Sequence, residues 1–184
     1  MSALGYFGKA PARGDFIGRG LPRSLTDGLE RWAKAGLAEA KERDAEGWLD
    51  AYLVSPVWRF AGGLGDALWT GVLCPSVDAA GRYFPLAIAA EVAGGDADGD
   101  LEGPWFDAAD AAVRDALAPE SFDLALWSER IDGLDAPDTV AADSRTSRWR
   151  GGADGLELQR DGALFDAPYA DFIQTRAGEA GGLL

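Results

Sequence analysis

The sequence predicts an α/β domain built on a mixed, largely antiparallel sheet. Segments with the short apolar runs of strands alternate irregularly with segments that repeat apolar residues at the spacing of a helix. The two best strand candidates, residues 67–74 and 82–91, are separated by a seven-residue turn and should therefore be antiparallel neighbours. Hydrophobic residues make up 47% of the 184 residues, enough for one sizeable core. We expect a single domain over residues 1–184.

The first half of the chain begins with a predicted strand at residues 4–8, followed by a loop rich in Pro, Gly and basic residues. A long helix is expected from Ser24 to about Glu46, with Ser24 as its N-cap and Asp27 three residues later. The helical repeat is carried by Leu25, Leu29, Trp32, Ala33, Gly36 and Leu37.

Residues 47–56 (GWLDAYLVSP) predict a short helical or extended piece, and residues 57–63 (VWRFAGG) a strand closed by glycines. Pro85 cannot donate a hydrogen bond to a neighbouring strand. The strand predicted at 82–91 must therefore begin after Pro85 or carry it at an edge or bulge.

The second half begins with an acidic stretch at residues 93–103, whose composition predicts an exposed loop within one domain. Helices are expected from Pro104, which suits a first helical turn, and over residues 121–134. A weak hairpin at 145–160 and a short helix around 169–173 complete the predicted elements.

Charge is distributed unevenly between the two halves. Residues 1–92 hold ten Lys plus Arg against eleven Asp plus Glu, whereas residues 93–184 hold seven against twenty, which gives net charges of −1 and −13. An acidic surface repels phosphate groups, so nucleic acid and anionic membranes are disfavoured as partners and a basic protein surface is favoured. Acidic residues that only maintain solubility are an equally good explanation.

The chain contains no histidine, which removes the commonest general base and the commonest transition-metal ligand. Hydrolases of the Ser-His-Asp and Cys-His types are excluded, and a zinc site is not expected. The single cysteine, Cys74, forms no internal disulfide and is interpreted as a small buried residue. Apolar runs are too short for a membrane helix and no signal segment follows Met1, so we expect a cytoplasmic protein that is not inserted in a membrane.

Known ligand motifs are incomplete. Lys9 follows Gly8 but precedes Ala10, so the hydroxyl residue of a phosphate-binding loop is missing. Residues 96–107 place three aspartates at calcium-ligand spacing, but the glycine turn and the final glutamate of a calcium loop are absent. We expect no cofactor and no metal.

Two polar loops hold the candidate site residues. The first contributes Lys9, Arg13 and Asp15, with Arg19 just beyond, and the second contributes Ser76, Asp78 and Arg82. If the loops meet, Asp15 and Asp78 could perform acid–base chemistry without histidine, although Asp and Arg in tight turns more often fix the shape of a loop. Ser76 has no evident base to activate it as a nucleophile, so no residue is assigned as catalytic.

Three segments in the first half resemble the TagF family, also called ImpM, of type VI secretion-associated proteins. They are GYFGKAPARGDFIGRGLPRSL, SPVWRF and GVLCPSVDAAGRYFPLAIA, and they occur in the family's order and spacing. The motif-bearing part spans residues 4–92, whereas residues 93–184 are more divergent. There, SRWRGG carries Trp149 alone where the family tends to have a Trp-rich strand.

The resemblance implies a three-layer α-β-α sandwich and a non-enzymatic cytoplasmic regulator. Such proteins repress assembly or firing of the type VI secretion system after translation by binding another protein, in some relatives the forkhead-associated scaffold Fha. The seven loop residues then become candidates for partner binding or for structuring the loops. Two alternatives stay open: a hydrolase or phosphatase-like enzyme that uses Asp15 and Asp78, and a structural accessory subunit of the secretion apparatus.

Overall fold

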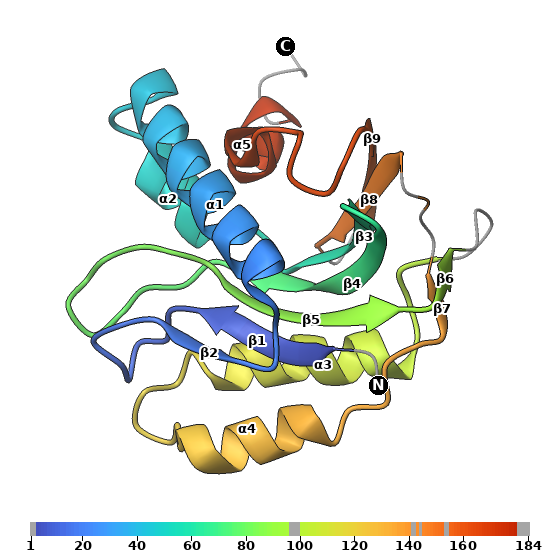
Figure 1. Cartoon of the computed structure of the whole chain (residues 1–184). Coiled ribbons are helices and arrows are strands. Elements are labelled where there is room, and N and C mark those ends of the chain that lie inside the picture. Colours follow the sequence, from blue (N-terminus) through green and yellow to red (C-terminus); the bar gives the residue numbers. More distant parts are fainter. Residues whose placement is uncertain (1–2, 96–99, 141–142, 144, 153–154, 180–184) are drawn as a thin grey trace.

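The structure is a computed structural model, and it describes residues 3–95, 100–140, 143, 145–152 and 155–179. These residues form a seven-stranded sheet with the order β2-β1-β5-β4-β3-β8-β9, and every neighbouring pair in it is antiparallel (Figure 1). Its strands are β1 (Leu4–Gly8), β2 (Ile17–Arg19), β3 (Trp58–Leu64), β4 (Ala67–Cys74), β5 (Leu86–Val92), β8 (Thr146–Gly151) and β9 (Leu156–Asp161). A separate parallel pair joins β6 (Gly94–Gly95) to β7 (Thr139–Val140).

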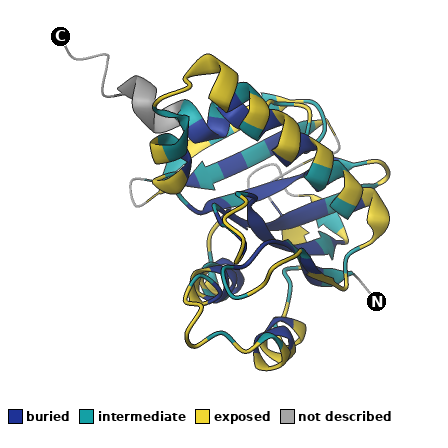
Figure 2. Ribbon diagram, turned by 90° about the vertical axis from the view of Figure 1, so that its left-hand side faces the viewer, coloured by how far each residue is buried: buried dark blue, intermediate teal, exposed yellow. Residues whose placement is uncertain are grey.

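Helices cover both faces of the large sheet. On one face lie α1 (Arg23–Arg43), α2 (Trp48–Leu53) and α5 (Tyr169–Glu179), and on the other lie α3 (Pro104–Asp115) and α4 (Leu124–Asp132) (Figure 1). None of these helices is long and apolar enough to cross a bilayer. Figure 2 shows the buried residues on the sheet and on the inner sides of the helices, while the outer sides are exposed.

The central strand β5 shows why both faces are covered. Side chains of a strand point alternately to its two faces. Leu86 and Ile88 belong to the hydrophobic cluster between the sheet and helices α3 and α4. Ala87 and Ala89 belong to the cluster between the sheet and helices α1, α2 and α5. Both sets are buried, which explains why the sequence of this strand is a nearly continuous apolar run instead of an alternation of apolar and polar residues.

Aromatic side chains fill the space between α1, α5 and the sheet. Trp149 of β8 lies at the centre, with ring centroids 4.5 Å from Phe172, 5.2 Å from Phe60 and 5.5 Å from Trp32. Aromatic pairs at these separations contribute packing energy beyond the area that they bury. The single Trp of the SRWRGG segment is therefore a core residue of the C-terminal hairpin.

Most elements agree with those predicted from the sequence, and the differences have local causes. The strands at 4–8 and 67–74 have the expected bounds, and β5 begins at Leu86, directly after Pro85. The prediction of Ser24 as an N-cap was wrong: the helix begins at Arg23, and the carbonyl of Pro22 accepts the N–H groups of Leu25 and Thr26.

The short strands β2, β6 and β7 were not expected. Residues 17–19 were predicted as loop, yet they pair with β1, where Tyr6 faces Arg19. Gly5 permits this close approach, because a Cβ atom on Gly5 would overlap the carbonyl oxygen of Arg19. The predicted helix at 121–134 is shorter in the structure, and Asp123 is its N-cap, accepting hydrogen bonds from Ala125 and Leu126.

Because α1 and α5 pack closely, adding one methyl group at Gly36 should destabilise the fold. Gly36 of α1 lies so close to Tyr169 that a Cβ atom would overlap that side chain. Gly36→Ala should lower the free energy of unfolding by about 1–3 kcal/mol, because the overlap outweighs the better helix propensity of Ala. Urea denaturation measures this, with Gly14→Ala as the control, since Gly14 has open space around it. Equal stability of Gly36→Ala and wild type would contradict the packing described.

Candidate functional site

The two polar loops named from the sequence lie side by side at one end of the sheet. The first loop, residues 9–16, leaves β1, and the second loop, residues 75–85, joins β4 to β5. Because β1 and β5 are antiparallel neighbours that pair Gly8 with Leu86, the first loop begins where the second one ends. The N–H of Ala79 donates a hydrogen bond of 2.7 Å to the carbonyl of Arg13, which joins the two loops directly.

The carboxylate of Asp78 is the centre of this arrangement. Its Oδ2 accepts hydrogen bonds from Nζ of Lys9 at 2.9 Å and from Nε of Arg82 at 2.7 Å. Its Oδ1 accepts the backbone N–H groups of Ala80 and Arg82, both at 2.9 Å. Arg82 also donates to the carbonyl of Gly14 at 2.6 Å, so this arginine links the second loop to the first. We call Lys9, Asp78, Arg82 and the Gly14 carbonyl the Asp78 cluster.

Burial and hydrogen bonding act on Asp78 in opposite directions. The side chain of Asp78 is 0% exposed and that of Lys9 is 8% exposed. Burial on its own would raise the pKa of Asp78, but the hydrogen bonds from Arg82, Lys9 and Ala80 outweigh it and hold this pKa well below its usual value of 3.8. Asp78 is therefore ionised at neutral pH, and two cations, Lys9 and Arg82, are bound to it.

Aromatic residues fix the position of Lys9. The ammonium group of Lys9 lies 5.0 Å from the ring centroid of Phe16, within the range of a cation–π contact. Phe16 stacks on Phe7 of β1 at 5.2 Å and meets Phe84 of the second loop edge-on at 4.9 Å. The same rings that close the core at this end of the sheet therefore hold the polar cluster in place.

Tyr52 of α2 also supports the second loop. Its hydroxyl donates to the carbonyl of Ser76 and accepts the N–H of Ser76, each at 2.9 Å. Burial raises the pKa of Tyr52 well above its usual range, so the hydroxyl stays protonated. The Ser76 hydroxyl is buried and has no hydrogen-bond partner among the described residues, so no base is in place to activate it.

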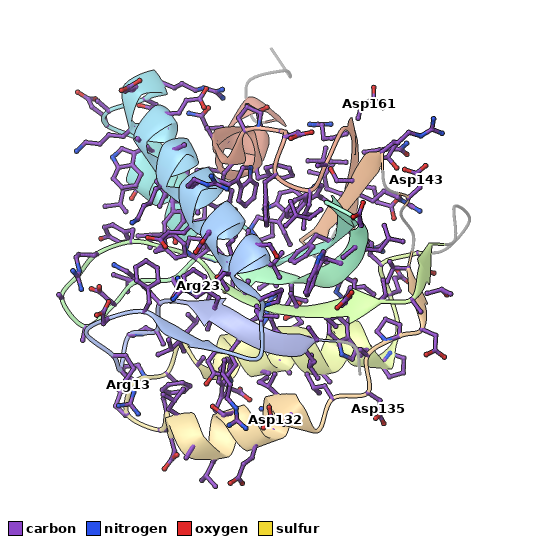
Figure 3. The ribbon with its side chains drawn as sticks, in the orientation of Figure 1. Arg13, Arg23, Asp132, Asp135, Asp143 and Asp161 are labelled. Carbon is purple, nitrogen blue, oxygen red and sulfur yellow. The ribbon has the colours of Figure 1, made fainter. Side chains whose placement is uncertain are left out.

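The remaining candidates do not join the Asp78 cluster. Arg13 is exposed and lies on the outside of the first loop (Figure 3). Asp15 is exposed, and its Oδ1 accepts the N–H of Phe16 at 2.8 Å. Arg19 binds Asp132 of α4 at 2.6 Å. The structure thus brings Lys9, Asp78 and Arg82 together, while Arg13, Asp15 and Arg19 remain at the surface.

Sequence reasoning missed Tyr52 and Phe16 as supports of the loops. The segment around Tyr52 was predicted only as a short helical or extended piece, and nothing in its pattern indicates a hydrogen bond to a residue 24 positions away. The interpretation of Cys74 is confirmed: the side chain is buried, and burial raises its pKa to about 12.

No group of three or more His, Cys, Asp or Glu side chains suited to a metal ion occurs in the described part of the chain. Residues 96–99 of the incomplete calcium pattern lie outside the described residues.

The chain is thus an α/β domain in which helices cover both faces of an antiparallel sheet and two loops are joined by a buried carboxylate at one end. The chain belongs to the family of the TagF N-terminal domain, described as type VI secretion system-associated, whose model matches residues 5–134.

Among solved structures, the chain is similar to PA0076 from Pseudomonas aeruginosa PAO1, determined at 2.05 Å resolution. The two are 27% identical, the similarity covers 93% of this chain and 94% of that one, and the TM-score is 0.78. A comparison with curated proteins found no match.

The lowered pKa of Asp78 predicts how Asp78→Asn changes stability with pH. A carboxylate whose pKa is lower in the folded state than the unfolded value of 3.8 stabilises the fold above that value. This stabilisation is lost as the pH falls through the folded-state pKa. Asp78→Asn should therefore unfold at lower urea concentration at pH 7, and its deficit relative to wild type should shrink below about pH 4.

Asp15→Asn is the matched control, because Asp15 is exposed and, among the described residues, its side chain accepts a hydrogen bond from Phe16 of its own loop. Its free energy of unfolding should stay within about 0.5 kcal/mol of wild type. A deficit of Asp78→Asn that is independent of pH down to pH 2 would contradict the role given to the Asp78 carboxylate.

Proposed function

We propose that this protein is a non-enzymatic regulator that represses assembly or firing of the type VI secretion system after translation. It acts in the cytoplasm by binding a protein of that system, with the forkhead-associated scaffold Fha as the first partner to test. Membership of a type VI secretion-associated family supports the biological setting. The observation that carries the binding role is the Asp78 cluster, which gives two exposed loops one fixed relative position.

A fixed pair of loops favours recognition, since a surface that is already ordered loses less conformational entropy when a partner binds. Arg13 has the exposure that recognition requires, and its backbone carbonyl is held by the second loop. We assign Arg13 a direct contact with the partner. Lys9, Asp78 and Arg82 are assigned to structuring the loops, and Ser76 supplies backbone groups that Tyr52 holds.

The arrangement of Asp78 favours binding over an enzyme that uses Asp15 and Asp78. A general base must accept a proton near neutral pH, whereas the lowered pKa of Asp78 makes this carboxylate a weak base. The hydrogen bonds of Asp15 and Asp78 share no partner. Turnover of phosphorylated scaffold peptides by the purified protein, abolished in Asp15→Asn, would support the enzyme instead.

We assign the chain to the three-layer α-β-α sandwich implied by the family resemblance. Support comes from the two hydrophobic clusters, one between the sheet and α3 with α4, the other between the sheet and the remaining helices.

Deletion of the gene in its native host separates a repressor from a structural subunit. Removal of a repressor should raise the amount of secreted substrate in the culture supernatant, whereas removal of a structural subunit should abolish it. Complementation with the wild-type gene should restore the low level. Unchanged or reduced secretion in the deletion strain would reject the repressor role.

Substitution of Arg13 tests whether this residue of the first loop contacts the partner. Arg13→Ala should weaken binding to purified Fha by about tenfold or more, because an exposed arginine at the centre of an interface is a common hot spot. Isothermal titration calorimetry measures the Kd. Lys41→Ala removes an equal charge from the last turn of α1 and should change Kd by less than about twofold. Equal effects of the two substitutions would remove Arg13 from the interface.

A further inference from the structure

The outer side of α4 and the preceding turn form a surface that the Asp78 cluster does not explain. A hollow of about 360 Å³ opens there to solvent. Its volume lies near the lower end of the ~300–1,000 Å³ typical of binding pockets. The apolar part of its lining consists of Ala118, Phe122, Leu126 and Trp127. We call this hollow, together with the exposed residues of the segment 115–138 that contains it, the α4 surface.

The floor of the hollow is held rigidly by Trp127. Its indole Nε1 donates a hydrogen bond of 2.8 Å to the carbonyl of Ala112 on α3. The Trp127 ring meets Tyr6 of β1 edge-on at 4.6 Å and Phe122 at 5.6 Å. Because these contacts fix the indole against the sheet, the hollow exists before any partner binds, which lowers the entropy cost of binding.

The apolar side chain of Leu126 is exposed to solvent beside Trp127. Its exposed fraction is 66%, the highest among the three exposed large hydrophobic residues of the described chain, and it stands on the α4 turn that lines the hollow. A single exposed leucine is common on protein surfaces. An exposed leucine that borders a preformed apolar hollow gives a partner two adjoining apolar contacts.

Charged residues of the segment that carries the hollow indicate the charge of the partner, although only Asp115, Asp123 and Arg130 line the hollow itself. Seven carboxylates and one basic residue, Arg130, lie within residues 115–138, and all eight are exposed. Arg130 pairs with Asp115 and Arg19 pairs with Asp132, so the surface keeps an excess of negative charge. Figure 3 shows Asp132 on α4 and Asp135 just beyond its end. The acidic residues are Asp115, Glu120, Asp123, Glu129, Asp132, Asp135 and Asp138.

We infer that the α4 surface binds a basic amphipathic segment of a protein partner. One apolar side chain of that segment fills the hollow beside Leu126, and its Lys or Arg side chains face the exposed carboxylates of residues 115–138. Nucleic acid and anionic lipid are disfavoured because their phosphates would meet the same carboxylates. A second copy of this chain is disfavoured because its net charge of −14 would oppose contact through an acidic surface.

This inference rests on the proposed function, since it gives the chemistry of the segment that the secretion-system partner presents. The ion pair between Arg19 and Asp132 connects β2, at the end of the first loop, to α4. One partner can therefore contact both the first loop and the α4 surface.

The test uses two synthetic peptides and the full chain. The first peptide carries lysine and leucine at helical spacing, and the second replaces every leucine by serine. Titration followed by ¹H–¹⁵N NMR gives Kd and the shifted amides. The leucine peptide should shift amides of residues 118–130 and bind about tenfold or more tightly than the serine peptide, because an apolar side chain becomes buried.

Matched variants locate the contact. Leu126→Ser should weaken binding of the leucine peptide about tenfold, whereas Leu53→Ser, at an exposed leucine of α2, should leave it within about twofold. Glu120→Lys with Glu129→Lys should weaken binding more than Glu42→Lys with Glu46→Lys, although both pairs change the net charge equally. Glu42 and Glu46 are exposed at the end of α1 and just beyond it, so folding is retained.

Equal weakening by the matched variants, equal affinity for the two peptides, or shifted amides outside the α4 surface would each overturn the inference. In cells, the Leu126→Ser gene should fail to restore repression in a deletion strain. If it restores repression fully while the deletion itself raises secretion, the α4 surface is not used and the proposed function stands. A deletion that does not raise secretion rejects the proposed function whatever the peptides show.

Discussion

The buried carboxylate of Asp78 is the constraint on which this end of the molecule depends. A charge without exposure to solvent is costly unless it is paired and hydrogen-bonded, and Asp78 meets both conditions through Lys9, Arg82 and the N–H of Ala80. These partners come from two loops that are 69 residues apart in sequence, measured from Lys9 to Asp78. Satisfying one carboxylate therefore fixes the relative position of both loops.

The sheet makes this possible by placing the loops beside each other. Pairing of β1 with β5 brings Gly8 opposite Leu86, and the aromatic residues Phe7, Phe16 and Phe84 close the core directly under the polar groups. On the other side of the sheet, Trp127 packs against Tyr6 of the same strand β1. The loops and the α4 surface are consequently both attached to strand β1.

Local patterns predicted much of the fold but not the long-range contacts of the site. The apolar runs of β1 and β4, the helical repeat of α1 and the proline before β5 are local signals. They gave β1 and β4 with the correct bounds, whereas α1 ends at Arg43 instead of near Glu46 and β5 begins at Leu86. The strand β2 carries no such signal because its three residues are stabilised by pairing with β1. Asp78 and Arg82 were named from their turn, whereas the support from Tyr52 depends on tertiary packing that spacing does not encode. The hollow beside Leu126 likewise forms only when α4 packs on β1 and α3.

The central claim is that the Asp78 cluster makes two loops behave as one unit, and native-state hydrogen exchange tests it most directly. The N–H groups of Arg13, Ala79 and Arg82 are all hydrogen-bonded within or between the loops. If one cluster holds them, they should open together with the same free energy, and Lys9→Met should lower the protection of all three by the same factor. Loss of protection at Ala79 and Arg82 with unchanged protection at Arg13, or three independent opening free energies in wild type, would contradict this account.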